Sequence, residues 1–145
     1  NLSATLIEAR SKKVAFLKNV KTLLGLKQLT VLNDRSEKLA HIDDLRGSFD
    51  FVVTRAVSSI AVMAELSLPF CKLGGRVILQ KKTGVENELD SAYQSIQAMG
   101  GVLKEVKEIH IRDLEEARVL VVLEKIGLTP RSYPRRPGIP QKRPL

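Results

Sequence analysis

The sequence predicts an α/β fold built on a mainly parallel β-sheet whose last two strands form an antiparallel hairpin. Short runs of aliphatic and β-branched residues alternate with stretches whose apolar residues recur at helical spacing. This order is typical of parallel sheets with crossover helices on both faces. The last two apolar runs are joined only by the polar stretch RDLEE, so we expect them to pair directly. With 145 residues and 43% hydrophobic content, the chain can bury the core of one domain.

The first half of the chain begins with a strand, a helix and a second strand. Residues 3–9 (SATLIEA) form a short aliphatic and β-branched run, as expected for a buried strand. In residues 10–26 an apolar stripe recurs at helical spacing, lysines occupy the opposite face, and Gly25 suits the helix end. Residues 29–34 (LTVLND) predict the second strand, and a short element follows it. The third strand, residues 49–57, is an apolar run that suits cover on both faces.

The second half repeats this pattern and closes with the hairpin. Ser58 or Ser59 is a plausible N-cap for the next helix, and Pro69 marks its end. A Gly-Gly turn leads into a fourth strand, and the third helix ends at another Gly-Gly pair. The expected elements are a helix over residues 58–75, a strand over 76–82, a helix over 86–101 and hairpin strands over 102–111 and 117–125.

The end of the chain, YPRRPGIPQKRPL, is rich in proline and arginine and carries no acidic residue. Proline lacks the backbone donor and fixes φ, so the segment is expected to be an extended arm, either loose or laid against the domain. The formal net charge is +8, and residues from Arg131 onward supply five positive charges, which leaves +3 for the rest. Charge concentrated in this way favours an anionic partner, most often nucleic acid. A solubilising tail is the alternative.

Several functional classes are disfavoured by composition. Cys71 is the only cysteine, and His41 and His110 lie far apart without ligand spacing, so neither a disulfide framework nor a metal site is expected. No stretch resembles a signal peptide or a membrane span. We therefore expect a soluble intracellular protein without a membrane partner.

In open α/β sheets, ligands bind beyond the carboxyl ends of the strands. Glu8 ends the first predicted strand, Ser36 and Glu37 follow the second, and Arg55 stands at the tip of the third. A strand-terminal carboxylate can accept hydrogen bonds from both hydroxyls of a ribose. Taken singly, such a residue is more often a helix cap or a surface group.

Taken together with the tail, these segments resemble a known family. The stretches LIEARSKKVAFLK, DRSEKLA, FDFVVTRAV, LGGRVILQKK and YPRRPGIPQKRPL resemble the small-subunit ribosomal RNA methyltransferase G family along essentially the whole chain. The ending PRRPGxPxKxPL is the most distinctive part. The resemblance implies a Rossmann-like class I methyltransferase that uses S-adenosylmethionine to methylate guanine N7 in 16S ribosomal RNA. The expected partner is that RNA or the 30S subunit, in the cytoplasm or an organellar stroma.

The resemblance also implies site residues, and it identifies no catalytic residue. A partial methyltransferase domain is expected over residues 1–128, and a basic proline-rich arm over residues 129–145. Guanine N7 is already a nucleophile, so the enzyme would act mainly by positioning. The residues expected at the cofactor are Glu8 at the ribose, Ser36 and Glu37 beside the adenine, and Arg55 at the junction with the substrate. The residues expected on RNA phosphates are Arg135, Arg136, Lys142 and Arg143.

The sequence departs from the family pattern in two places. The family's first strand and its glycine-rich cofactor loop would precede Asn1, and none of the nine glycines forms a GxG pattern. That strand would lie between the one ending at Glu8 and the one ending at Arg55, so both should show an unpaired edge. We therefore expect a piece of a longer protein, inactive by itself. Val119 stands where the family tends to carry histidine.

Two other functions stay open from the sequence alone. The chain could be a catalytically silent RNA-binding module that retains the basic arm. It could also be a nucleotide-binding α/β domain that uses NAD, although the lack of GxGxxG counts against this alternative.

Overall fold

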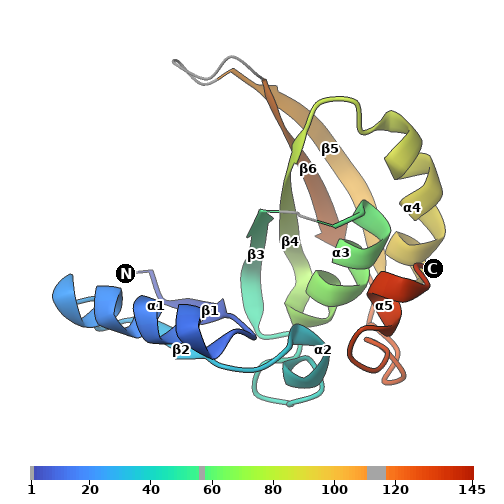
Figure 1. Cartoon of the computed structure of the whole chain (residues 1–145). Helices are drawn as coiled ribbons and strands as arrows, with labels where there is room; N and C mark the ends of the chain where they lie inside the picture. The colour runs from blue at the N-terminus through green and yellow to red at the C-terminus, as the bar shows by residue number, and fades with distance from the viewer. Residues whose placement is uncertain (1, 56–57, 111–116) are drawn as a thin grey trace.

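The computed structural model describes residues 2–55, 58–110 and 117–145, and it has the predicted α/β order (Figure 1). The strands are β1 (Ala4–Ile7), β2 (Leu29–Leu32), β3 (Phe49–Arg55), β4 (Cys71–Lys82), β5 (Gly101–Ile109) and β6 (Arg118–Lys125). The helices are α1 (Ser11–Leu23), α2 (Ser36–Leu39), α3 (Ile60–Ser67), the 3-10 helix η1 (Leu68–Phe70), α4 (Glu86–Ala98) and α5 (Ile139–Lys142). Each expected element is present, but the helix expected over residues 58–75 ends at Ser67, and residues 71–75, including the expected Gly-Gly turn, belong to β4. The short helices η1 and α5 were not predicted.

The strands form two sheets. β1 and β2 pair in parallel, and the second sheet has the order β3-β4-β6-β5. β3 and β4 are parallel, while β6 is antiparallel to both of its neighbours, so it alone runs opposite to the rest of that sheet. The predicted hairpin is confirmed by pairing from Gly101 with Lys125 to Ile109 with Arg118. Ile111, the last residue of the first expected hairpin strand, and the connection RDLEE lie outside the described residues.

The two sheets are separated where the sequence led us to expect an interruption. Within the described ranges, β1 pairs only with β2 and β3 pairs only with β4, so each strand has one edge without a strand partner. In Figure 1 the unit of α1, β1 and β2 lies to one side of the four-stranded sheet. The expected pair of unpaired edges is therefore observed.

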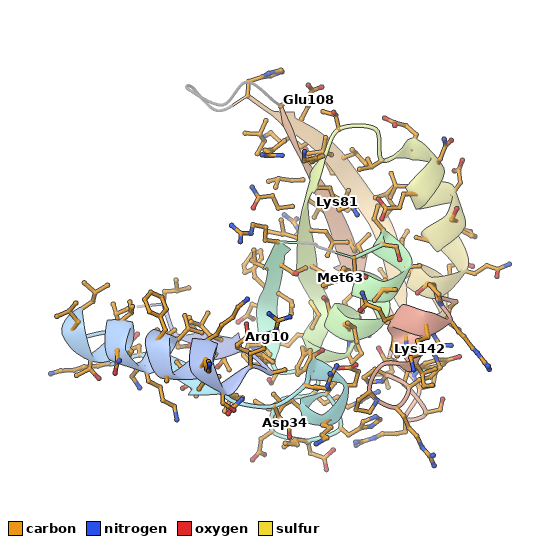
Figure 2. All side chains as sticks on the ribbon, viewed as in Figure 1. Arg10, Asp34, Met63, Lys81, Glu108 and Lys142 are labelled. Carbon is orange, nitrogen blue, oxygen red and sulfur yellow. The ribbon has the colours of Figure 1, made fainter. Side chains whose placement is uncertain are left out.

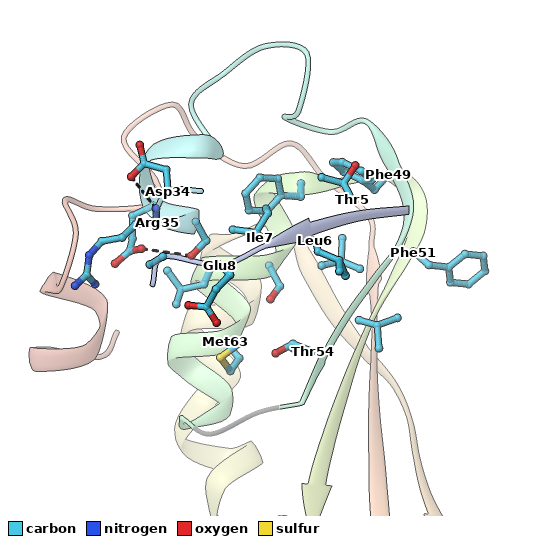
Figure 3. Close-up of a pocket in the computed structure, with 18 of the residues that line it drawn as sticks. Thr5, Leu6, Ile7, Glu8, Asp34, Arg35, Phe49, Phe51, Thr54 and Met63 are labelled. Carbon is cyan, nitrogen blue, oxygen red and sulfur yellow. Dashed lines mark hydrogen bonds between the residues drawn. The ribbon is translucent and has the colours of Figure 1, made fainter. Parts of the chain in front are cut away.

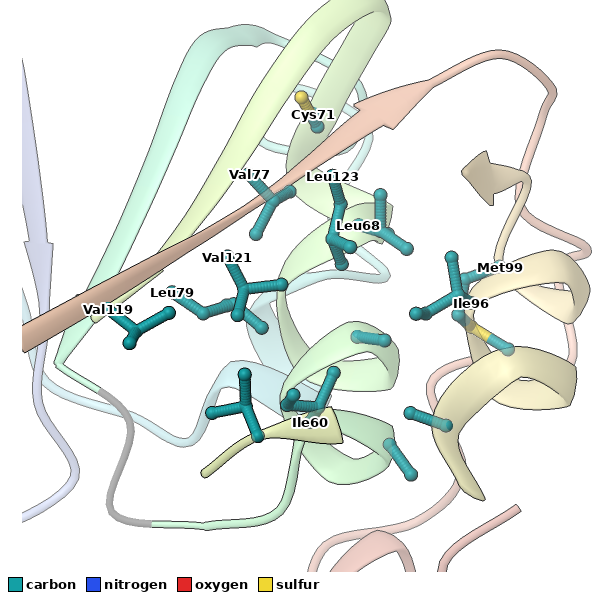
Figure 4. Close-up of a cluster of buried hydrophobic side chains, with 14 residues drawn as sticks. Ile60, Leu68, Cys71, Val77, Leu79, Ile96, Met99, Val119, Val121 and Leu123 are labelled. Atoms are coloured by element: carbon teal, nitrogen blue, oxygen red, sulfur yellow. The ribbon is translucent and has the colours of Figure 1, made fainter. Parts of the chain in front are cut away.

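The main core lies between α3, α4 and one face of the four-stranded sheet (Figure 4). Strand β6 buries every second side chain there, and the fully buried Val121 and Leu123 face the buried Leu68 and Ile96. Burying an aliphatic side chain of this size contributes about 1.5–3 kcal/mol. Val119, the position where the family tends to carry histidine, is buried in this core and packs as an apolar residue.

The start of α3 is fixed by two polar contacts. Ser59 is the N-cap, as one of the two predicted alternatives, and its hydroxyl accepts a hydrogen bond from the Val62 backbone N–H at 3.4 Å. The Glu88 carboxylate accepts from the Ile60 N–H at 2.7 Å and pairs with Lys81, also at 2.7 Å. These acceptors satisfy donors that the first turn of a helix leaves free.

Two expectations about cover were wrong. β3 is not covered on both faces in the part of the chain that the structure describes, because Phe51 and Val53 are 61% and 70% exposed. The predicted apolar stripe of α1 is mostly exposed to solvent: Val14 is buried, but Phe16 is 66% exposed. The reason is architectural: α3 and α4 lie on the same face of the four-stranded sheet, and α1 lies with β1 and β2.

Residues 129–145, here called the C-terminal segment, are laid against the domain. The Arg46 guanidinium donates hydrogen bonds to the backbone carbonyls of Thr129, Pro130 and Tyr133 at 2.9–3.0 Å. The His41 Nε2 lies 2.9 Å from the Pro134 carbonyl. Proline removes backbone donors but leaves carbonyl acceptors, so side-chain donors from the rest of the domain can fix such a segment.

Candidate functional site

A cavity of about 570 Å³ opens at the carboxyl end of β1, between β1 and the unpaired edge of β3. Residues at the ends of β1 and β2 form its polar rim. Its apolar wall is formed by Ile7, Phe49, Met63 and Phe70. Figure 3 shows the side chains of Glu8, Met63 and Thr54 around this space. The polar or charged lining residues include Thr5, Glu8, Asp34, Arg35, Ser36, Glu37, Thr54 and Gln141. Part of this space lies between the edges of β1 and β3 that have no strand partner in the described residues.

Glu8 stands at the rim, directly after β1. Its carboxylate accepts a hydrogen bond from the Arg10 backbone N–H at 2.8 Å, and Lys13 lies 3.8 Å away. The Arg10 N–H is the main reason that the pKa of Glu8 lies below its ordinary value, and the Lys13 charge adds to it. The side chain of Asn33 donates to the Glu8 carbonyl at 3.1 Å and so fixes the turn. Glu8 is therefore an ionised carboxylate with acceptor positions left for a ligand.

The turn between β2 and α2 supplies the next polar groups. Asp34 accepts from the Arg35 backbone N–H at 2.8 Å and pairs with Lys38 at 3.3 Å, and these contacts lower its pKa, the backbone hydrogen bond most. Glu37 is 7% exposed, and its Oε2 accepts from the Ser36 hydroxyl at 3.3 Å. Its Oε1 accepts from the backbone N–H of Gly138 at 3.0 Å. Glu37 thus joins the cavity rim to the C-terminal segment.

Three of the four predicted cofactor residues, Glu8, Ser36 and Glu37, line this one cavity. Arg55 is exposed at the end of β3 and is not among the lining residues, although the preceding Thr54 is. Alternation along the strand does not account for this, because Phe51 and Val53, which share the face of Arg55, line the cavity. The role of each residue toward a cofactor stays a prediction.

Sequence reasoning missed Gln141 as a residue of this site. Its side-chain amide donates to the Ser58 hydroxyl at 3.1 Å, and the residue lines the cavity. It comes from the proline-rich segment, in which only arginine and lysine residues were predicted to be functional. Nothing near Gln141 in the sequence indicates that the chain folds back over a distance of more than 80 residues.

The four predicted RNA-binding cations differ in their surroundings. Arg136, Lys142 and Arg143 are exposed, and in the described parts of the chain their side chains make no hydrogen bond or ion pair. Lys142 is labelled on α5 in Figure 2. Arg135 is different: its guanidinium contacts the Glu65 carboxylate, with Nη2 2.6 Å from Oε2. Three cations are thus available to an anion, and the fourth is engaged inside the protein.

The described residues contain neither a candidate metal centre nor a candidate membrane-spanning helix. Among residues 2–55, 58–110 and 117–145, no group of three or more His, Cys, Asp or Glu side chains could hold a metal ion. In the same ranges, no helix is both long and apolar enough to cross a membrane.

Comparison with protein families gives a match over most of the chain. The profile of the family described as rRNA small subunit methyltransferase G matches residues 1–118. Proteins named ribosomal RNA small subunit methyltransferase G are similar over nearly the whole chain. The one from Dehalococcoides mccartyi is 44% identical over 140 residues, covering 97% of this chain and 60% of that protein. The one from Lactobacillus johnsonii is 39% identical over 145 residues, covering 100% of this chain and 61% of that protein.

Solved structures support the fold. A crystal structure of M. jannaschii TYW2 in complex with AdoMet has a TM-score of 0.61 at 17% identity, covering 86% of this chain and 58% of that one. An rRNA methylase from Streptococcus thermophilus has a TM-score of 0.58 at 13% identity, covering 86% and 74%. At such identities the likeness shows a Rossmann-like methyltransferase fold.

The sequence relatives decide the family. The chain spans about 60% of the length of the curated relatives that it matches. Within that span, the family profile, the level of identity and the fold agree. The chain belongs to the rRNA small subunit methyltransferase G family.

Proposed function

We propose that the full-length protein containing this chain transfers a methyl group from S-adenosylmethionine to guanine N7 of 16S ribosomal RNA. One observation supports this proposal most strongly: Glu8, which follows β1, lines one cavity with the adjacent residues Ser36 and Glu37, which follow β2. This is where open α/β sheets bind nucleotide ligands. Family membership gives the substrate class.

The residues present fit a nucleoside cofactor. The ionised Glu8 can accept hydrogen bonds from the two hydroxyls of a ribose, and Ile7 and Met63 offer an apolar surface for a flat base. Bound S-adenosylmethionine supplies an electrophilic methyl group. Because guanine N7 carries a free lone pair, no side chain has to remove a proton. The work of this chain is to orient the two reactants and exclude water, with Arg55 near their junction.

We propose that the gap between β1 and β3 holds a further β-strand with its cofactor loop. Each strand has an unpaired edge on this side, and both contribute residues to the cavity, so the added strand would fill the part between β1 and β3 and leave the part lined by Glu8, Ser36 and Glu37 to the cofactor. An added strand would pair the free backbone groups of both edges, since a parallel strand bonds to neighbours on each side. The relatives are long enough to contain it, because the chain spans about 60% of their length.

The C-terminal segment is proposed to bring RNA to the cavity, with residues 1–128 as the methyltransferase domain and 129–145 as the RNA-contacting segment. Arg136, Lys142 and Arg143 are exposed on the same segment as Gln141, which lines the cavity. Arginine and lysine contacts to phosphate are sequence-tolerant and release counterions. The partner is the 30S subunit or its 16S RNA, so the reaction would occur in the cytoplasm or an organellar stroma.

Calorimetry with S-adenosylmethionine on the full-length protein tests the cofactor part. Glu8→Gln keeps the shape but removes the charge, so affinity is expected to fall between about tenfold and a hundredfold, the range for a lost charge-assisted hydrogen bond. Asp50→Asn is the matched control, because Asp50 is an exposed carboxylate paired with Lys72 away from the cavity. Equal affinity in Glu8→Gln and wild type would remove Glu8 from the site.

The RNA part is tested by a salt series. Replacing Arg136 and Lys142 together by alanine is expected to make the negative slope of log affinity against log salt shallower by about one to two units. RNA binding without any binding of S-adenosylmethionine would instead favour the silent RNA-binding module.

A further inference from the structure

Glu65 is a buried carboxylate on α3, with 1% of its surface exposed. Among the described residues, all hydrogen bonds to this carboxylate come from one residue of the C-terminal segment. The Arg135 backbone N–H lies 2.8 Å from Oε1, Nε lies 3.0 Å from Oε1, and Nη2 lies 2.6 Å from Oε2. Hydrogen bonding to Glu65 is the main reason that the pKa of Arg135 is raised above its ordinary value. A buried carboxylate needs such a partner, because an unpaired charge in the interior is costly.

Two further contacts hold the segment beside the cavity. The backbone N–H of Gly138 donates to Glu37, and Gln141 donates to the Ser58 hydroxyl. Gly138 has φ +83°, a conformation that favours glycine, and it comes just before α5. The segment therefore turns at Gly138 and places Gln141 at the cavity. Arg135 comes three residues before this turn and directly after Pro134, which His41 contacts.

We propose that Glu65 and Arg135 form a positioning pair that holds the C-terminal segment at the cavity mouth. In this arrangement Arg135 acts on RNA through the placement of Arg136 and Lys142, not by contacting a phosphate itself. The guanidinium uses Nε and Nη2 on Glu65, which has no other partner in the described structure, so only Nη1 is left for a second anion. The side chain of Arg135 is 24% exposed, whereas that of Glu65 is 1% exposed, so Glu65 cannot turn to water. The inference rests on the proposed RNA-directed function.

The effect of Glu65→Gln separates positioning from direct contact. Glu65 is a buried carboxylate, so it cannot bind RNA itself. If Arg135 contacted a phosphate directly, removing the charge of Glu65 would strengthen the attraction between Arg135 and that phosphate. If the pair positions the segment, Glu65→Gln weakens RNA binding about tenfold, because the carboxylate that orients Arg135 and the segment is gone. Arg135→Lys keeps the charge but loses the two-pronged contact, so it should weaken binding similarly. Asp43→Asn is the control, since it breaks the exposed 2.7 Å pair with Arg131 on the same segment.

Amide hydrogen exchange of the RNA-free full-length protein provides a readout that involves neither RNA nor methyl transfer. Exchange at Gly138 is expected to be faster in Glu65→Gln and Arg135→Lys, and unchanged in Asp43→Asn. With RNA, KM should rise about tenfold while kcat changes less, because the segment delivers substrate and does no chemistry. Faster exchange without any RNA binding in wild type would uphold the pair and defeat the proposed function.

The opposite results would overturn the proposal. Unchanged or tighter RNA binding in Glu65→Gln, with Arg135→Lys equal to wild type, would make Arg135 a direct phosphate contact. If Glu65→Gln does not fold, as judged by circular dichroism, Arg135→Lys decides alone. In that variant the buried carboxylate keeps a cationic partner, so wild-type exchange at Gly138 would defeat the positioning role.

Discussion

Arg46 offers the most direct test that the C-terminal segment is docked and not loose. Its guanidinium donates to four backbone carbonyls: those of Ala40 at 2.8 Å, Thr129 at 2.9 Å, and Pro130 and Tyr133 at 3.0 Å. Three of the four acceptors belong to the C-terminal segment. Desolvation among these groups lowers the pKa of Arg46 below its ordinary value, and the guanidinium still stays charged. Arg46→Ala removes all four donors at once.

The expected loss follows from the burial of the acceptors. The contacts to Ala40, Thr129 and Tyr133 are partly buried, and the contact to Pro130 is exposed. A partly buried hydrogen bond contributes about 1 kcal/mol net, and an exposed one contributes little because water replaces it. We therefore expect Arg46→Ala to lower the free energy of unfolding by about 3 kcal/mol. Arg46→Lys keeps one donor group, the ammonium, in place of the guanidinium, and should recover only about a third of the lost unfolding free energy.

Urea unfolding of the full-length protein measures this difference, with Arg131→Ala as the control. Arg131 also ties the segment to the domain, through Asp43, but the two side chains are 70% and 77% exposed. An exposed ion pair of this kind contributes about 0–1 kcal/mol. If Arg46→Ala and Arg131→Ala destabilise the protein equally, the four carbonyl contacts do not hold the segment, and the docked arrangement is refuted.

Two more predictions concern stability. Gly100→Ala should destabilise the protein by about 3 kcal/mol, because Gly100 has φ +75° and an added Cβ would overlap the backbone of Gly127. Gly74→Ala is the control: Gly74 has φ +77° with open space around it, so the substitution should cost only about 1 kcal/mol. Equal losses of unfolding free energy in the two variants would contradict this reasoning. Burial lowers the pKa of Lys125 from its ordinary 10.5 to about 8, so above pH 8 the folded state holds fewer protons there than the unfolded state, and stability should rise with pH by at most about 1.4 kcal/mol per unit. Burial raises the pKa of the Cys71 thiol to about 11, so Cys71 makes stability fall with pH from about pH 9. The rise in stability caused by Lys125 is therefore measured by urea unfolding between about pH 7.5 and 9. Lys125→Met should show no rise there, and a flat wild-type profile would refute the prediction.

Local patterns in the sequence predicted the elements well. The apolar run in residues 117–125 predicted a strand, and β6 buries every second side chain, from Val119 to Lys125. Ser59 was one of two predicted N-caps, and it makes the contact that a cap makes. These features depend on neighbours a few residues away, so a short window of sequence contains them.

Features that depend on distant partners could not be predicted in this way. The apolar run of β3 suited a strand covered on both faces, yet Phe51 and Val53 are exposed, because cover depends on which elements pack there. The proline-rich ending excluded a long helix, but its donors come from Arg46, more than 80 residues earlier. Glu65 likewise meets a partner 70 residues later in the chain. No local signal marks either residue.

The cofactor residues fall between these two cases. Glu8, Ser36 and Glu37 were expected at strand ends, and the parallel pairing of β1 with β2 brings those ends together at one cavity. Arg55 ends a strand of the other sheet, and it does not line the cavity. The family resemblance supplied the ligand, whereas the position of each side chain depended on the sheet.

Methyl transfer to small-subunit ribosomal RNA is the most direct test of the whole account. The full-length protein would be incubated with labelled S-adenosylmethionine and with 30S subunits that lack this modification, and the RNA would be digested and analysed by mass spectrometry. The account predicts labelled 7-methylguanosine in the 16S RNA, with a raised KM for S-adenosylmethionine in Glu8→Gln. An absence of label from 16S RNA, or a label on a position other than guanine N7, would contradict it.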